Sequence, residues 1–420
     1  MDVENMRQKK THLLSCLSLL SLAVVGALTA SPLYAADAHP LQIKLEDLRY
    51  SQQQVNAQNP QFVGAYHKLI AVADKALNKP LYSVMDKTLI AASGDKHDYY
   101  SFPPYWWPDP TKKDGLPYLR KDGETNPDAN SDATDKKRLV SMSNDVWTLA
   151  LAWQFTQKPA YAEKARDQLL NWFVKPETRM NPNLQYAQAI PGINDGRGIG
   201  LIDSRALVEV IDAVELLRPA NVISDEDYQK IKQWYGDFYH WMTTSQNGFE
   251  EDNWHNNHGT YFDLQAASFA LFSGDTAAAK KRLQITQLRR IPSHFDKEGR
   301  QMAEIERTRP WHYSNFHLEA YNKLGRLGEV AGVDVWNFSL DDHSLRKGYH
   351  YIAHYINGNE SWPWKDIDKM DDKKALINMV SAVRAWPDDK VFSEKAAWLM
   401  AKYPDDISHL ITPLKPHSQG

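Results

Sequence analysis

The spacing of apolar residues is the feature that most limits how this chain can fold. Apolar side chains recur three and four positions apart, as at Tyr228, Ile231, Tyr235, Phe238 and Met242. This spacing is typical of one face of an α-helix, whereas a half-buried strand alternates at every second residue. No comparable series of alternating strands occurs in the sequence. The chain is therefore predicted to be all-α.

The same spacing predicts helices along most of the chain. They cover residues 62–77, 142–153, 160–174, 207–217, 224–242, 275–290, 314–331, 343–356, 374–386 and 391–402. Ser224 is expected to cap one of them, because a serine side chain accepts a hydrogen bond from the first turn. Antiparallel helix pairs assemble into a bundle, a solenoid or an α/α toroid. A solenoid is the least supported because no clean repeat is present.

Residues 1–35 differ from the rest of the chain. Basic residues precede an apolar run over residues 13–28, and small residues follow near Ala35. This layout predicts a secretory signal peptide and a periplasmic or secreted protein. The run is short and broken by Ser and Gly, so no stable membrane insertion is expected after cleavage. Residues 36–420 contain no low-complexity linker and are predicted to form one domain.

Composition argues against several classes of function. Cys16 is the only cysteine and lies in the apolar run, so the mature chain would have no disulfide or thiolate chemistry. The formal net charge of −4 gives no support to a nucleic-acid partner. No His-Glu-x-x-His or cysteine cluster indicates a metal, although His255 and His258 are close enough to share one. We therefore predict neither a metal nor another cofactor.

Two short polar stretches stand immediately before apolar helical segments, over residues 253–263 and 304–316. Their polar members include Asn256, Asn257, His258, Arg307, His312 and Tyr313. Helix capping and buried hydrogen bonds would explain one such stretch alone. Two similar stretches favour a shared cleft between two helix starts.

A long connection over residues 93–136 presents aromatic rings between prolines. Tyr105, Trp106 and Trp107 are its central rings, and Trp362 is a weaker case elsewhere. Prolines prevent a regular helix here, and flat aromatic faces suit sugar rings. Packing of the same rings into the core is the alternative. Connections of this length are more often functional than incidental.

A second long connection covers residues 176–198. It carries Asn194 and Arg197, and Arg205 follows at the start of the next helix. Its Gly-x-Gly sequence follows no predicted strand, so a nucleotide site is a poor interpretation. We expect these polar side chains to contribute to the same cleft.

Asn257, His258, Arg307 and Tyr313 are the candidate catalytic residues. Amide and guanidinium donors suit a reaction that develops negative charge on a carboxylate. In the β-elimination of a polyuronate, a base removes the proton on C5 and an acid protonates the departing glycosidic oxygen. A tyrosine next to a cation and a histidine near neutral pH are both suitable. The residues leave open whether His258 or Tyr313 is the base.

Segments 97–110, 193–205, 256–259 and 307–313 resemble the motifs of alginate-lyase-domain proteins, which include polysaccharide lyase families 5 and 38. The resemblance covers roughly residues 90–330. It implies an incomplete α/α toroid, a deep cleft for an anionic polysaccharide and a metal-free elimination.

The resemblance also implies roles for individual residues. Asn257 matches the asparagine that neutralises the substrate carboxylate in family 5. His258 matches the adjacent catalytic histidine, and Tyr313 matches the catalytic tyrosine.

The arginine departs from the family 5 pattern. Family 5 places it seven positions before the tyrosine, where this chain has Glu306, whereas Arg307 lies six before. This spacing resembles family 38, in which Asn194 would neutralise the carboxylate. Family 38 includes members active on glucuronan as well as on alginate.

The sequence therefore predicts an exported lyase that cleaves a β-1,4-linked polyuronate, alginate first and glucuronan second. Mannuronate and glucuronate differ only at C2, so catalytic residues do not separate them. One rival is a glycoside hydrolase, with Glu304 and Glu306 as its two carboxylates. These residues are equally expected to pair with Arg307 and Arg309. The other rival is a periplasmic oligosaccharide-binding protein without turnover.

Overall fold

The computed structural model describes residues 37–358 and 360–416, and the expected signal peptide over residues 1–35 lies outside this part. The described helices are α1 (Leu45–Asn56), α2 (Pro60–Leu77), α3 (Lys136–Thr156), α4 (Pro159–Phe173), α5 (Leu207–Leu216), α6 (Asp225–Thr244), α7 (Gln246–Asp252), α8 (Asn257–Ser273), α9 (Thr276–Ile285), α10 (Ile291–His294), α11 (Met302–Ile305), α12 (Pro310–Ala331), α13 (Leu345–His354), α14 (Leu376–Ala385), α15 (Lys390–Lys402) and α16 (Ser408–Ile411). The strands are β1 (Trp106–Trp107), β2 (Leu119–Arg120), β3 (Ser339–Leu340) and β4 (His343–Ser344). None of the helices described here is long and apolar enough to cross a membrane.

The helix predictions from apolar spacing are confirmed with small shifts at the ends. Ser224 caps α6 as expected, because its hydroxyl oxygen accepts a hydrogen bond of 3.1 Å from the backbone N–H of Asp227. The helix predicted over residues 275–290 is interrupted. After α9 the backbone forms a π-helical turn over Thr286–Arg290 and then continues as α10.

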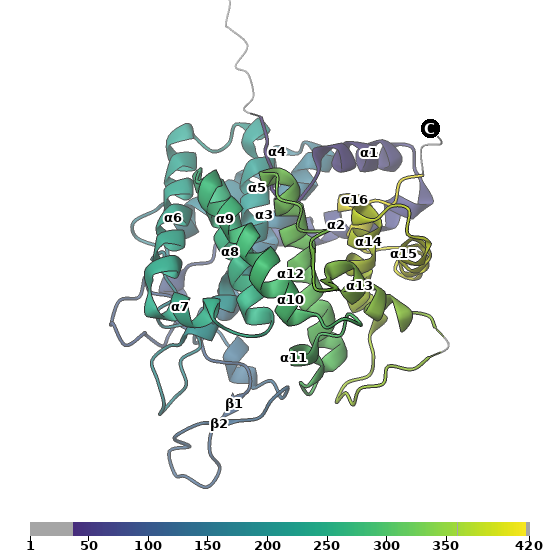
Figure 1. The fold of residues 1–420 in the computed structure, drawn as a ribbon. Coiled ribbons are helices and arrows are strands. Elements are labelled where there is room, and N and C mark those ends of the chain that lie inside the picture. The colour runs from purple at the N-terminus through teal and green to yellow at the C-terminus, as the bar shows by residue number, and fades with distance from the viewer. Residues whose placement is uncertain (1–36, 359, 417–420) are drawn as a thin grey trace, which may run out of the picture. The chain divides into compact units, whose positions relative to one another are not determined.

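The helices form the predicted incomplete α/α toroid (Figure 1). Along its inner layer α3 packs on α5, α5 on α8, α8 on α12 and α12 on α14. The outer layer covers them, with α4 on α3, α6 on α8, α9 on α8 and α12, and α13 and α15 on α14. Apart from α5, each of these inner helices thus lies between its neighbours and an outer partner.

Helix α8 is the most enclosed element near the polar stretches. Its side chains are buried on nearly every face, because α5, α6, α9 and α12 all pack against it. A helix that is buried on nearly every face belongs to the core, whatever the polarity of single side chains. Asn257, its first residue, is therefore held in place by the packing of the whole helix.

The two long connections meet on one side of the inner helices. Tyr100 forms a β-bridge with Tyr186, which joins the first connection to the second. Both are also tied to the segment before α5, since the hydroxyl of Ser101 and the amide of Gln188 donate hydrogen bonds of 2.6 and 2.9 Å to Asp203. Strands β1 and β2 form a hairpin that projects from this side (Figure 1).

Candidate active site

A cleft of about 860 Å³ opens where the two connections meet the N-termini of α8 and α12. The predicted residues that line it are Tyr105, Trp106, Arg197, Arg205, Asn256, Asn257, His258, Arg307, His312 and Tyr313. Further lining residues include Arg120, Lys136, Gln188, Asp203, Trp254, His255 and Glu306. The two polar stretches and both connections therefore contribute to a single cleft.

Cations outnumber carboxylates in this lining. Its basic residues are Arg120, Lys136, Arg197, Arg205 and Arg307, whereas its acidic residues are Asp203 and Glu306. Burial lowers the pKa of Arg197 to about 10, which leaves the guanidinium charged at neutral pH. The cleft is thus locally positive in a chain of net charge −4, as an anionic ligand requires.

Two side chains lie within hydrogen-bond distance of the Tyr313 hydroxyl. Arg307 donates a hydrogen bond of 3.0 Å from Nη2 to this oxygen, and the hydroxyl of Tyr105 lies 2.6 Å from it. The guanidinium of Arg307 also stands over the Tyr313 ring, 4.0 Å from its centroid. The phenol is held in a fixed direction at the first turn of α12, where Pro310 suits the first helical position.

The pKa of Tyr313 is higher than the positive charge of Arg307 alone would make it. Burial raises the pKa of Tyr313 well above the usual phenol value, although the positive charge of Arg307 acts in the opposite direction. Arg307 thus acts toward the phenolate, as a cation beside a tyrosine should, but burial outweighs this effect and favours the protonated phenol. A protonated phenol is suited to donate a proton.

Arg307 takes its orientation from Asp122, not from the glutamates next to it in sequence. Its Nη2 and Nε atoms donate hydrogen bonds of 2.8 and 3.2 Å to the two oxygens of Asp122. Arg309 pairs with Asp368 at 2.5 Å. The expected pairing of Glu304 and Glu306 with these arginines is thus replaced by partners far away in the chain.

Glu304 instead holds Asn257. Its Oε1 accepts the backbone N–H of Asn257 at 2.6 Å, and its Oε2 accepts the side-chain Nδ2–H at 2.8 Å. Only 1% of Glu304 is exposed, and burial raises its pKa to about 7 against the effect of these hydrogen bonds. Because both oxygens are engaged behind Asn257, Glu304 is poorly placed to flank a glycosidic bond as a hydrolase acid.

His258 has a buried carboxylate behind its ring. Nδ1 lies 2.9 Å from Oε1 of Glu251, whose side chain is fully buried. Burial raises the pKa of Glu251, and the neighbouring His258 opposes this rise. When Nδ1 donates to this carboxylate, the lone pair of a neutral imidazole resides on Nε2. No described residue forms a hydrogen bond with Nε2, so it is available to a ligand in the cleft.

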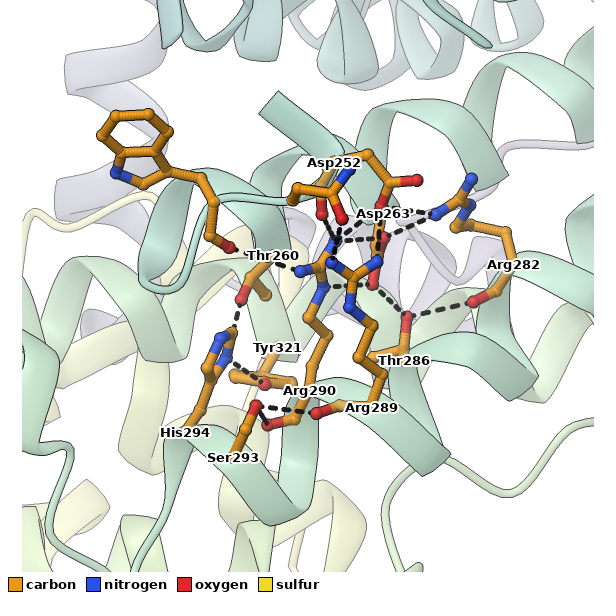
Figure 2. A network of polar contacts seen from close by, with 12 residues as sticks. Asp252, Thr260, Asp263, Arg282, Thr286, Arg289, Arg290, Ser293, His294 and Tyr321 are labelled. Atoms are coloured by element: carbon orange, nitrogen blue, oxygen red, sulfur yellow. Dashed lines mark hydrogen bonds and ion pairs between the residues drawn. The ribbon is translucent and has the colours of Figure 1, made fainter. Parts of the chain in front are cut away.

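A buried arginine fixes the turn that leads into α8 (Figure 2). Arg290 donates hydrogen bonds from Nε to Asp263 at 3.0 Å and from Nη2 to the carbonyl of Asp252 at 2.7 Å. Its Nη1 reaches the carbonyl of Trp254 at 3.3 Å. Gly259 is required at this point, because a Cβ atom there would lie 2.4 Å from the Trp254 carbonyl oxygen. The π-helical turn that ends at Arg290 is thus part of the support for the site.

Asn256 completes this turn. Its side-chain oxygen accepts a hydrogen bond of 3.1 Å from the backbone N–H of His258, which makes it the N-cap of α8. The capping expected for this stretch and its place in the cleft are therefore both present. Asn256 is 5% exposed, and its side-chain oxygen is engaged in this cap.

The paired tryptophans of β1 differ in position. Successive side chains of a strand point to opposite faces. Trp106 lines the cleft with the guanidinium of Arg197 5.8 Å from its ring centroid. Trp107 does not line it, and its Nε1 donates to the carbonyl of Glu124 at 3.0 Å.

Two other predicted binding residues also lie outside the lining of the cleft. The side-chain oxygen of Asn194 accepts hydrogen bonds from the backbone N–H groups of Ile190 and Gly196, at 3.2 and 3.3 Å. It therefore shapes its own loop. Trp362 packs among other rings, with its centroid 5.1 Å from those of Trp311 and Tyr355. Of the two amides expected to neutralise a substrate carboxylate, Asn257 lines the cleft and Asn194 does not.

Comparisons with known proteins show the family of this chain. The family model for alginate lyase matches residues 83–362. The chain belongs to the alginate lyase family. This chain is a polysaccharide lyase, and the expected enzyme class is confirmed. A search of curated proteins found no match.

Solved structures of alginate lyases resemble this lyase. The crystal structure of an alginate lyase from Bacteroides ovatus is 35% identical and covers 90% of this chain and 100% of that chain, with a TM-score of 0.84. Alginate lyase A1-III from Sphingomonas species A1 is 13% identical over 85% of this chain and 97% of its own, with a TM-score of 0.52. A variant of A1-III complexed with a tetrasaccharide has the same identity and TM-score and covers 86% and 97%. The two A1-III structures support the fold alone.

The sequence did not single out two of the carboxylates that orient the lyase's polar groups, and it gave the third, Glu304, other roles. Asp122, Glu251 and Glu304 each hold one candidate catalytic residue. Asp122 lies in a polar loop with no feature that separates it from its acidic neighbours. Glu251 stands at the end of the short helix α7, seven positions before His258. For Glu251, this spacing to His258 was the only signal that the sequence offered.

Proposed function

We propose that this polysaccharide lyase is exported and cleaves a β-1,4-linked polyuronate, alginate rich in mannuronate first, by metal-independent β-elimination. The contact between Arg307 and the hydroxyl of Tyr313 in a cation-lined cleft carries the proposal. A uronate carboxylate in this cleft meets guanidinium and amide donors, and the phenol lies beside them. Export is supported by the signal-peptide layout of residues 1–35.

The residues divide the elimination into two proton transfers. Nε2 of His258 takes the proton from C5, and the electron pair moves toward the carboxylate as an enolate-like intermediate. Asn257 and Arg307 stabilise that charge. The bond between C4 and the glycosidic oxygen then breaks, and the phenol of Tyr313 gives its proton to the departing oxygen. The product carries a double bond between C4 and C5.

The division of roles rests on the two environments. The raised pKa of Tyr313 favours the protonated phenol, which suits an acid and not a base. His258 has Glu251 behind Nδ1 and no described partner at Nε2. In mannuronate the C5 proton and the C4 oxygen lie on the same side of the ring, so both residues act on one face of the sugar.

A panel of purified polymers tests the proposal. Polymannuronate, glucuronan and polyguluronate are incubated with the protein, and ultraviolet absorbance of unsaturated products is followed alongside reducing ends. Polymannuronate should give both signals fastest. Polyguluronate should react more slowly, because its C5 configuration is inverted. Reducing ends without absorbance would show hydrolysis, and binding without either signal would show a binding protein. Faster cleavage of glucuronan would reverse the order of substrates.

A further inference from the structure

A second cavity of about 660 Å³ runs through the inner layer of the toroid. It is lined by α3, α5, α12 and α14, and it shares Arg205, His312 and Phe316 with the cleft. Its volume lies in the range of about 300–1,000 Å³ that is usual for small-molecule sites. The cavity is therefore a continuation of the cleft beyond these three side chains.

One stripe of α12 follows the length of this cavity. The lining residues of the stripe are His312, Phe316, Glu319, Lys323 and Arg326, and Glu329 follows at the end. Their spacing of three and four places them on one helix face. Seventeen helical steps from the first to the last correspond to about 25 Å at 1.5 Å per residue. A ligand that enters past His312 thus meets a long polar wall.

Most charged groups of the cavity already have partners. Lys323 pairs with Glu209, Arg326 with Glu329 at 3.2 Å, and Arg384 with Asp47 at 2.9 Å. Asp212 accepts backbone N–H groups of residues 41–43 at 2.7 to 3.1 Å. These groups form the wall of the cavity and have little capacity left for a ligand.

Three charged residues close to the cleft differ. Among the described residues none forms an ion pair with Arg205, Lys374 or Glu319, although all three line the cavity. The guanidinium of Arg205 donates to the carbonyl of Ile202 at 3.1 Å and stands over Phe316, 5.4 Å from its ring centroid. Arg205 and Lys374 are partly exposed, and two cations without an ion-pair partner in one cavity favour an anionic ligand.

Contacts along α12 bring Lys374 to the junction: it lies in the 3₁₀ turn Asp372–Ala375, which packs on α12, and Nε1 of Trp311 donates a hydrogen bond of 2.7 Å to the carbonyl of Asp371 beside this turn. Burial and then the positive charges of Lys374 and Arg309 lower the pKa of His312 to about 4. Burial raises the pKa of Glu319, and Lys323, Arg205 and Lys374 oppose that rise. Lys374 and Arg205 thus both act on side chains at the junction between cleft and cavity.

We propose that the junction is a second uronate-binding site, in which Lys374 and Arg205 bind the carboxylate of a sugar away from the cleaved bond. Glu319 accepts hydrogen bonds from the hydroxyls of that sugar. Ammonium and guanidinium groups form charge-assisted hydrogen bonds with carboxylates, and a carboxylate is an acceptor for hydroxyl groups. The proposal rests on the proposed function, since it requires a polyuronate in the cleft.

Oligomannuronates of increasing length test this site with Lys374→Gln. For oligomers long enough to reach the junction, the variant should lower kcat/KM about tenfold, which corresponds to loss of one charge-assisted hydrogen bond. The shortest cleaved oligomers should be unaffected, and kcat at saturation should stay unchanged. Lys374→Arg should restore most of the affinity, and melting curves show whether each variant is folded.

Lys369→Gln is the matched control, because Lys369 is exposed and lines neither cavity. Equal losses at every oligomer length, or no loss relative to Lys369→Gln, would overturn the second site. Failure of the proposed function looks different, because the unaltered protein would then form no unsaturated product from any polymer. An unaltered protein that forms this product while Lys374→Gln behaves like the control contradicts the second site alone.

Discussion

Oε1 of the fully buried Glu251 lies 2.9 Å from Nδ1 of His258, while Nε2 of the same ring has no described partner. A buried carboxylate behind an imidazole selects which nitrogen carries the proton and holds the ring in one orientation. The same arrangement recurs with other groups in this cleft. Asp122 holds Arg307 from behind, and Glu304 holds Asn257.

Glu251→Gln should lower kcat about tenfold or more with a smaller change in KM, because a misdirected imidazole is a poorer base. Steady-state kinetics on polymannuronate provides the measurement. Glu163→Gln, on the exposed side of α4, is the control for loss of one negative charge. Unchanged kcat in a folded Glu251→Gln protein would show that this carboxylate does not direct His258.

Glu304 should give the activity a pH dependence near its pKa of about 7. Above this pH the carboxylate accepts both donors of Asn257, whereas protonation converts one acceptor into a donor. Activity should therefore rise as the pH increases through about 7. The rise should be less steep in Glu304→Gln than in Glu306→Gln, whose exposed side chain lines the cleft without holding Asn257. Equal slopes in these two variants would remove Glu304 from the pH profile.

As the pH rises, the contribution of Glu304 to stability should fall, whereas activity should rise. The pKa of Glu304 is raised from 4.5 in the folded protein, so the folded state retains the proton to higher pH than the unfolded chain. Its contribution to stability is therefore greatest at low pH and decreases as the pH rises from about 4.5 to about 7. Denaturant unfolding should show the unaltered protein losing stability over this range relative to Glu304→Gln. A constant difference would show that burial does not shift this carboxyl group.

The tryptophans of β1 form a natural matched pair. Trp106→Ala should raise KM several-fold, because the ring lines the cleft beside Arg197 and offers a flat face to a sugar. Trp107→Ala should leave both kinetic constants near those of the unaltered protein. Kinetics and melting temperatures are measured for both. A larger kinetic effect from Trp107→Ala would contradict the placement of the two rings.

Chelation should leave activity unchanged. Asn257 and Arg307 supply the positive and hydrogen-bonding groups that neutralise the carboxylate in the proposed mechanism, which gives a divalent cation no required role. The test is the rate of product formation after exhaustive dialysis against a chelator. Loss of activity that one added metal restores would contradict this part of the mechanism.

The helices could be predicted because their faces repeat apolar residues every three or four positions, as in α6. Helix α1 could not, since its sequence is mostly polar and its packing depends on α16, more than 350 positions later. Candidate catalytic residues stood out where polar side chains preceded an apolar helix. Their supports did not, because Asp122 reaches Arg307 across 185 positions of the chain. The sequence also did not distinguish Trp106 from Trp107, because the difference in their positions comes from the alternation of side chains along a strand.

Tyr313→Phe tests the central claim most directly. The change deletes one oxygen and keeps the ring, so packing should be retained while the proton donor is lost. Turnover on polymannuronate, followed by ultraviolet absorbance, should fall about a hundredfold or more, with polymer binding and melting temperature largely retained. Tyr105→Phe, which removes only the neighbouring hydroxyl at 2.6 Å, should be less damaging. Near-normal turnover of a folded Tyr313→Phe protein would contradict elimination with this phenol as the acid.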